Sequence, residues 1–446
     1  MSSLANLSIN FKSFCKINFS GGDMSSDCGL LLIGQFMKSM GITSFIQKNF
    51  GADAPKRGKH SDADILLQLL YQSMAGYSTD DAADHLAHDP VMKTLLHKTR
   101  LASQPTISRF RHRLGYVSQI ELNDILAFLR RQAYKVQRPR EVVFDVDTTI
   151  LRTYGKQDGS EYIYHYGDVG YHPILCYDGN TGDLLKAELR DGSMYCGKGA
   201  AEFVRPLLEE YQRDYPGIRV LVRGDSGFAM PDLYECVEAF SNASYIIRLK
   251  ANTVLQEHVQ DAASALMREH AGKPGLPAPR YGEFLYAAGT WSRERRVVYK
   301  IELRRSEGAI ELFPACTFIV TNRDDSPEKI FKVYPNRGNM ENFIKESKNE
   351  FNFESMCSRE KTVNENRLAV SAIAYGIFNI FRRLSLRGDW KKFRASEIRL
   401  RLLHIAGRYV SHSGERLFRL GSAYPYKVQF SLIHYQIDAL GRILTG

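Results

Sequence analysis

Residues 142–249 carry the pattern that most constrains the fold, a succession of short apolar segments separated by turn residues. Short runs rich in β-branched and aromatic residues indicate strands, whereas apolar residues spaced three or four apart indicate helices. The pattern predicts strands at 142–147, 162–164, 173–177, 184–189, 218–222 and 244–249, and helices at 200–212 and 232–240. Antiparallel-type strands followed by helix, strand, helix and strand predict an α/β domain built on a mixed sheet.

Two of the predicted strands end in acidic residues. Asp145 and Asp147 point to the same face of their strand, because side chains alternate along a strand. Asp225 follows the next apolar run and lies in a loop between two glycines. A carboxylate at the end of a buried strand is costly unless it binds something, and ligands of α/β sheets sit at strand ends. The alternative is that these acids only cap a strand or a turn.

A third candidate acid lies in the segment from Tyr334 to Lys348, which has the spacing Tyr-x2-Arg-x3-Glu-x6-Lys. On a helix, Tyr334, Arg337, Glu341 and Lys348 fall within roughly 60° of one another. One helix face would then present a carboxylate, two cations and a phenol, which suits a divalent metal and a phosphate. Pro335 is expected near the start of this helix. The alternative is a surface helix held by salt bridges.

Two strand-end aspartates and a helix glutamate can together hold two hard cations about 4 Å apart, an arrangement suited to phosphodiester chemistry. The chain carries a formal net charge of +10, with a pI of about 9.1. Between Arg382 and Arg419 there are 11 Lys and Arg and 3 Asp and Glu, hence 11 − 3 = +8. This excess indicates a polyanionic partner, nucleic acid rather than membrane. A solvated basic helix is the alternative.

The flanks of the α/β region are predicted to be mostly helical. In the N-terminal region, one helix is expected to begin at Ser61 or Asp62 and to end at Gly76. A later one contains Pro105 near its start and then Arg109, Arg111 and Arg113, which resembles a helix-turn-helix DNA reader. A plain helical bundle is the alternative. A β-rich insertion is expected at about 254–320, and helices from Tyr334 to the C-terminus.

The seven cysteines are scattered and include no Cys-x2-Cys pair, so neither a structural zinc site nor a disulfide framework is expected. The N-terminal residues do not resemble a signal peptide, and no apolar run is long enough to span a membrane. These observations are typical of a protein of the reducing cytosol.

With its ordered acids and complete Tyr-Arg-Glu-Lys spacing, the sequence resembles the DDE-type transposases of insertion sequences. The resemblance covers about 140–385. It implies an RNase H-like catalytic core, Mg²⁺ or Mn²⁺ as cofactor, binding of DNA at terminal inverted repeats and in the target, and strand transfer in a homodimeric synaptic complex. It also implies a bacterial, nucleoid-associated protein. The expected regions are a helical DNA-binding or dimerisation region at 1–137, a catalytic domain at 138–385 and a basic helical region at 386–446.

Asp225 matches the second acid of that family and Glu341 the third. For the first acid, Asp147 fits better than Asp145, because Thr149 and Gly155 follow it at the family's spacing; Asp145 is kept as a supporting metal ligand. By the same resemblance, Tyr334, Arg337 and Lys348 would contact DNA phosphates.

Trp291 is a candidate for stacking on a flipped base, with an ordinary hairpin-surface tryptophan as the alternative. Two other functions stay open: an RNase H-like nuclease that does not join DNA, and a non-catalytic DNA-binding protein derived from a transposase.

Overall fold

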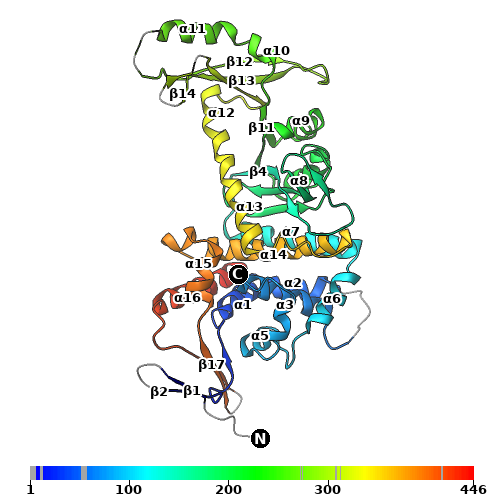
Figure 1. Cartoon of the computed structure of the whole chain (residues 1–446), viewed down its shortest axis with the longest axis vertical. Coiled ribbons are helices and arrows are strands. Elements are labelled where there is room, and N and C mark those ends of the chain that lie inside the picture. Colours follow the sequence, from blue (N-terminus) through cyan, green and yellow to red (C-terminus); the bar gives the residue numbers. More distant parts are fainter. Residues whose placement is uncertain are drawn as a thin grey trace. The chain divides into compact units, whose positions relative to one another are not determined.

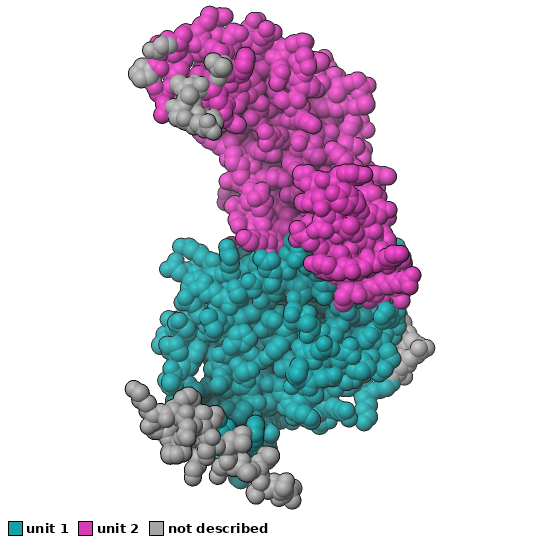
Figure 2. Space-filling model, in the orientation of Figure 1, with its two compact units in different colours: residues 1–136, 346–355, 366–446 teal, residues 137–345, 356–365 magenta. Residues whose placement is uncertain are grey.

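The computed structural model describes residues 7–10, 14–51, 58–271, 273, 275–306, 309–311, 313–412 and 415–445. The chain forms two compact units (Figure 2). The first unit comprises residues 1–136, 346–355 and 366–446, and the second comprises 137–345 and 356–365. Much of the stretch considered for a signal peptide, residues 1–6 and 11–13, lies outside the described residues.

The second unit is built on a mixed sheet (Figure 1). Five strands form its core: β4 (Glu141–Thr148), β8 (Ile174–Asp178), β9 (Leu184–Glu188), β10 (Arg219–Gly224) and β11 (Ala243–Leu249). Their order is β9-β8-β4-β10-β11. β10 runs parallel to β4 and to β11, whereas β8 is antiparallel to both β4 and β9. This order and these directions are those of an RNase H-like core, so the predicted mixed α/β sheet is confirmed.

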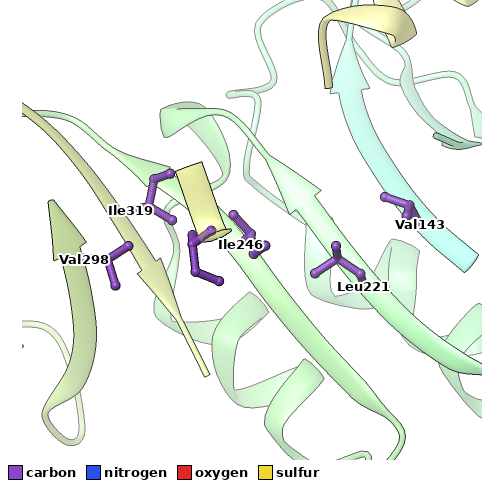
Figure 3. Packing of buried hydrophobic residues seen from close by; sticks show 6 residues of the cluster. Val143, Leu221, Ile246, Val298 and Ile319 are labelled. Carbon is purple, nitrogen blue, oxygen red and sulfur yellow. The ribbon is translucent and has the colours of Figure 1, made fainter. Parts of the chain in front are cut away.

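Helices cover both faces of this sheet, because the side chains of its strands alternate between faces. On one face, the Phe144 ring of β4 contacts the Tyr211 ring of α8, with ring centres 5.1 Å apart. On the other face, Ile330 joins a cluster of buried side chains from five strands (Figure 3). These side chains are Val143, Leu221, Ile246, Val298 and Ile319. The covering helices are α8 (Ala200–Asp214), α9 (Pro231–Glu238) and, on the cluster side, α12 (Pro327–Val333).

The predicted β-rich insertion extends the core sheet instead of forming a separate layer. β16 (Ala315–Thr321) pairs antiparallel with β11, β13 (Arg295–Glu302) with β16, and β12 (Arg280–Tyr286) with β13. Adding strands satisfies the backbone groups along the β11 edge. The insertion also contains a two-stranded sheet and two helices in a stretch predicted to be irregular. These are β14 (Arg305–Ser306), β15 (Ala309–Ile310), α10 (Thr253–Glu257) and α11 (Gln260–His270).

A small antiparallel sheet lies in sequence between β4 and β8. Its order is β5-β7-β6, with β5 (Leu151–Arg152), β6 (Glu161–Ile163) and β7 (Asp168–Tyr171). The predicted strand at 162–164 therefore exists, but it belongs to this small sheet and not to the core sheet.

The first unit is mostly helical, and its helix starts follow local signals. Ser61 and Asp64 form a capping box at the start of α3, and Gly76 ends that helix with φ = 95°. Both ends agree with the sequence prediction, because a capping side chain and a left-handed glycine act locally. The described helices include α1 (Leu30–Ser39), α2 (Ile42–Asn49), α3 (Asp62–Ala75), α4 (Ala82–His85), α5 (Pro90–Leu95), α6 (Gln104–Arg113), α7 (Tyr116–Val136), α15 (Ala395–Ile398) and α16 (Lys427–Thr445). Most of α14 (Lys361–Ser385) also belongs to this unit.

Both flanking regions contain helices, as predicted, but each also contains strands that were not predicted. In the basic C-terminal segment, Tyr409 and Phe418 face each other across a hairpin, with ring centres 5.1 Å apart. Cross-strand aromatic pairs of this kind stabilise hairpins. The strands of this unit are β1 (Leu7–Asn10), β2 (Phe14–Ile17), β3 (Met24–Ser25), β17 (Gly407–His412) and β18 (Glu415–Leu420).

Among the described residues, no helix is both long enough and apolar enough to cross a membrane.

Candidate active site

Asp147 and Asp225 come from the ends of neighbouring parallel strands in the second unit. Arg223 of β10 pairs with Asp145 of β4; Asp147 follows two residues later in β4, and Asp225 lies directly after the end of β10. Because residues two apart point to the same face, Asp147 and Asp225 lie beside each other on the face that α12 covers. Asp225 is held in a tight turn, where its Oδ1 accepts a hydrogen bond from the Gly227 amide at 2.8 Å.

Arg337 lies between the two aspartates. Its Nη2 is 2.9 Å from Oδ2 of Asp147 and 3.5 Å from Oδ2 of Asp225. Its Nε is buried and has no hydrogen-bond partner among the described residues. Burial opposes the charge of Arg337, but the carboxylates of Asp147 and Asp225 outweigh it and raise its pKa. The guanidinium therefore stays charged beside the two acids.

Asp147 is itself in an unfavourable position for an ion. Burial raises its pKa to about 6, although the charge of Arg337 and the Thr148 amide oppose this effect. The negative charges of Asp225 and Glu341 raise it further, so these three acids interact electrostatically. A bound cation would stabilise the ionised form of such a carboxylate, because its positive charge compensates the negative charge that burial disfavours.

The segment that carries Arg337 and Glu341 begins with a tight helical turn. α12 is followed directly by a 3-10 turn at Tyr334–Gly338 and then by α13 (Asn339–Glu350). Residues three apart eclipse in a 3-10 turn, so Tyr334 and Arg337 share a face, as the spacing predicts. Tyr334 packs on the apolar cluster of the sheet. Glu341 lies in the first turn of α13 and is exposed to solvent.

Lys348, near the end of α13, has a different environment from the other members of the motif. Its Nζ is 2.8 Å from Oε1 of Glu354, and both residues belong to the first unit. The predicted contact of Lys348 with a phosphate stays a prediction.

Asp145 forms a buried ion pair. Its two carboxylate oxygens accept hydrogen bonds from Nε and Nη2 of Arg223, each at 2.6 Å. Arg223 also donates through Nη1 to the backbone oxygen of Val333 at 2.8 Å, which ties β10 to the end of α12. Both carboxylate oxygens are engaged, and this is why we leave Asp145 out of the metal ligands proposed below. Arg223 is a residue of this site that was not predicted from the sequence, although a cation within an apolar strand, two residues before Asp225, could have indicated it.

The donor set fits a divalent cation. Among the described residues, no three His, Cys, Asp or Glu side chains lie close enough together to hold a metal ion. Two hard carboxylates nevertheless share one cationic group, the Arg337 guanidinium. Oxygen donors of this type are those that Mg²⁺ and Mn²⁺ prefer.

The three arginines predicted to read DNA lie on α6 in different surroundings. Arg111 is buried and pairs with Asp80, with 2.9 Å between Nη2 and Oδ1. Arg113 pairs with Asp62. Arg109 and Arg113 line a cavity of about 690 Å³ in the first unit, to which Lys59, His60 and Arg100 also contribute. The positions of Arg109 and Arg113 are thus compatible with contacts to DNA, whereas Arg111 stabilises the fold.

Trp291 lies in the turn between β12 and β13 and is half-buried among aromatic side chains. Its ring centre is 5.3 Å from that of Tyr234 and 5.4 Å from that of Tyr286, in edge-to-face geometry. The guanidinium of Arg295 lies 5.6 Å from its ring centre. These contacts favour the alternative of a structural hairpin tryptophan, and its predicted stacking on a base stays a prediction.

Comparison with known proteins finds a family model and a solved structure that are similar to this chain. A family model described as transposase DDE domain, group 1, matches residues 7–442. No curated protein matches the chain. A solved structure described as the piggyBac transposase synaptic complex with hairpin DNA is similar at 12% identity and a TM-score of 0.41, with 85% of this chain and 80% of that chain covered.

Proposed function

This chain belongs to the family of transposases with a DDE domain of group 1, and from that premise we propose that it binds transposon ends, cleaves DNA phosphodiesters and joins the released end to target DNA. The observation that carries the proposal is the pairing of Asp147 and Asp225 at the ends of adjacent parallel strands around one cationic group. Strand ends of an α/β sheet are where such folds bind their ligands.

We assign Asp147, Asp225 and Glu341 as the ligands of Mg²⁺ or Mn²⁺. The bound ions would activate the attacking water or 3′-hydroxyl and stabilise the leaving oxygen. Glu341 is exposed at the start of α13, and its charge already acts on Asp147. Both observations support its assignment as the third ligand.

Arg337 is the residue that we expect to bind the scissile phosphate. Its buried Nε has no partner within the described part of the chain and can donate to a phosphate oxygen without giving up an existing bond there. Tyr334 shares its face and is assigned to a neighbouring phosphate, as is Lys348 further along α13. Arginine suits this role because its planar group donates two parallel hydrogen bonds to a phosphate.

DNA is the partner that the charge favours. The net charge of +10 supplies long-range attraction for a polyanion. In the first unit, Arg109, Arg113 and Arg100 line one cavity, and we assign them to the backbone of the transposon end. We also propose that the protein acts in the bacterial cytoplasm as a homodimer that pairs two transposon ends.

The test compares two aspartate variants on DNA that carries the inverted repeats flanking the gene. Asp225→Asn keeps the Oδ1 acceptor for the Gly227 amide, so the turn should persist. We expect cleavage in Mg²⁺ to fall at least about 100-fold while end binding persists. Asp261→Asn, an exposed aspartate of α11, is the control and should cleave normally.

The products distinguish the alternatives. Strand-transfer products in a plasmid integration assay support a transposase, whereas cleavage without joining indicates a nuclease. Specific end binding with no cleavage by the wild type under any divalent ion indicates a DNA-binding derivative. Full cleavage by Asp225→Asn would contradict the assignment of the acids.

A further inference from the structure

Exposed tyrosines are concentrated in one part of the second unit. Among the described side chains, seven tyrosines are exposed, and four of these seven lie within residues 154–195. Tyr154 and Tyr164 are 93% and 92% exposed, Tyr195 is 56% exposed and Tyr162 is 50% exposed. Single exposed aromatic residues are common, but several that converge on one surface mark a binding site.

The small sheet that carries three of these tyrosines contacts the end of the catalytic strand. Tyr162 lies on β6, and its ring centre is 5.2 Å from that of Tyr164 in the turn between β6 and β7. Two residues later in this turn, the Tyr166 hydroxyl donates to the backbone oxygen of Thr148 at 3.3 Å. Burial raises the pKa of Tyr166 to about 12, and the charge of Asp147 adds to this effect. The turn is therefore adjacent to Asp147.

The loop that carries Tyr195 joins the same sheet to the Asp225 turn. The Ser193 amide donates to the Glu161 carboxylate of β6 at 2.9 Å. A Cβ on Gly192 would lie 2.4 Å from the Gly170 carbonyl oxygen of β7, and a Cβ on Gly197 would lie 2.4 Å from the Gly227 carbonyl oxygen. Only glycine permits such close backbone approach at both ends of the loop. Tyr195 is thereby held between the sheet and the Asp225 turn. Burial raises the pKa of Tyr195, and the charges of Cys196 and then Asp225 add to this effect.

We propose that Tyr162, Tyr164 and Tyr195 form a stacking platform for unpaired DNA bases next to the scissile phosphate. The proposal rests on the proposed function, because it takes the DNA strand to lie at Asp147 and Asp225. Tyrosine offers an apolar π-face to a base and a hydroxyl to water, so it tolerates exposure between binding events. The bases of an intact duplex are already stacked on each other, and hence the platform selects unpaired nucleotides.

The position of the platform beside Asp147 and Asp225 favours DNA over a protein partner. Lys156 and Lys198 are exposed in the loops that carry the platform and can contact the phosphates between stacked bases. Tyr154, two residues after the end of β5, extends the aromatic surface of the small sheet. Trp291, the tryptophan considered for this role from the sequence, is instead engaged by Tyr234 and Tyr286.

The test measures DNA binding without chemistry. The variant Tyr162→Ala/Tyr164→Ala/Tyr195→Ala is compared with wild type by fluorescence anisotropy in EDTA, using a short single-stranded oligonucleotide of mixed sequence and the matching duplex. The control is Tyr116→Ala/Tyr435→Ala, which removes two tyrosines of the first unit that are 79% and 69% exposed. We expect single-strand affinity to fall about 5- to 150-fold for each stacked base lost, with duplex affinity unchanged and the control like wild type.

A second variant separates stacking from folding. The triple Tyr→Phe variant keeps the rings and should retain single-strand affinity, and quenching of a 2-aminopurine probe should follow the same order. Unchanged single-strand affinity in the alanine variant, or equal loss on single strand and duplex, overturns the proposal. A change in oligomeric state with unchanged single-strand affinity also overturns it and identifies the patch as a protein contact. Because the binding assay contains no metal, its result does not depend on cleavage. A wild type that binds single strands in EDTA but does not cleave DNA in a separate assay with Mg²⁺ contradicts the proposed function and leaves the platform supported.

Discussion

The buried pair of Asp145 and Arg223 gives the sharpest test of which aspartate holds the fold and which performs chemistry. Both side chains are buried, and two 2.6 Å hydrogen bonds join them. Replacing Asp145 by Asn leaves the Arg223 guanidinium buried without a countercharge. Removing one partner of a buried pair costs about 3–5 kcal/mol. We therefore expect Asp145→Asn to be strongly destabilised.

The size of the effect can be expressed as a melting temperature. For a domain of 150–250 residues, each kcal/mol shifts the midpoint by about 2–4 °C. The cost of about 3–5 kcal/mol then corresponds to a loss of roughly 6–20 °C, measured by calorimetry or circular dichroism in EDTA. Urea unfolding of the same samples should give the free energy directly.

Asp147→Asn is the matched control, two residues along the same strand. The folded-state pKa of Asp147 is about 6, raised from 3.8 chiefly by burial. Its ionised form therefore costs stability, and this cost develops as the pH rises from about 4 to about 6. The asparagine side chain does not ionise and so avoids this loss of stability. At neutral pH we therefore expect Asp147→Asn to have unchanged or increased stability but to have lost cleavage.

The assignment of the two acids is refuted if Asp145→Asn has the same melting temperature as the wild type, or if Asp147→Asn is the more destabilised of the two. Either result would mean that the ion pair contributes little or that the roles of the two acids are exchanged.

Two further predictions concern arginines. Arg337→Ala should tighten Mn²⁺ binding in the absence of DNA by at least about tenfold, because a cation this close to Asp147 repels the metal by a few kcal/mol. The affinity can be measured by titration with Mn²⁺ followed by electron paramagnetic resonance. Unchanged or weaker binding would count against a metal site that Asp147 and Asp225 share. Arg111→Ala should lower stability by about 1.5–3 kcal/mol, since Arg111 hydrogen-bonds the Asp80 carboxylate, and leave DNA affinity intact. Arg109→Ala should do the reverse, weakening DNA binding in anisotropy assays without a change in unfolding; the opposite pattern for the two variants would exchange their roles.

Local signals in the sequence predicted much of the core. The apolar runs ending at Asp147 and Asp225 became β4 and β10, with the helices between the later strands as expected. Ser61 and Gly76 marked the two ends of α3. These features are encoded within a few residues, because alternation, capping and left-handed turns depend on neighbours in the chain.

The sequence pattern failed where pairing with distant residues decides the structure. The basic segment around Tyr409 forms a hairpin because its residues pair with those around Phe418 and with β3. The sequence pattern had predicted helix for the same residues. The insertion strands join the core sheet at β11 for a similar reason, since an open edge takes a new strand whatever its place in the chain.

By itself, then, the sequence determined the strand-end acids, the order of the core elements and the spacing that brings Tyr334, Arg337 and Glu341 onto one helical segment. Only the tertiary structure showed that Asp145 and Asp147 have different partners. Arg223 lies 78 residues from Asp145, and it is the parallel register of β10 on β4 that joins them. From the sequence, only a family resemblance favoured Asp147 over Asp145. In the structure, buried Arg223 binds Asp145 through Nε and Nη2, and Arg337 contacts Asp147 beside Asp225.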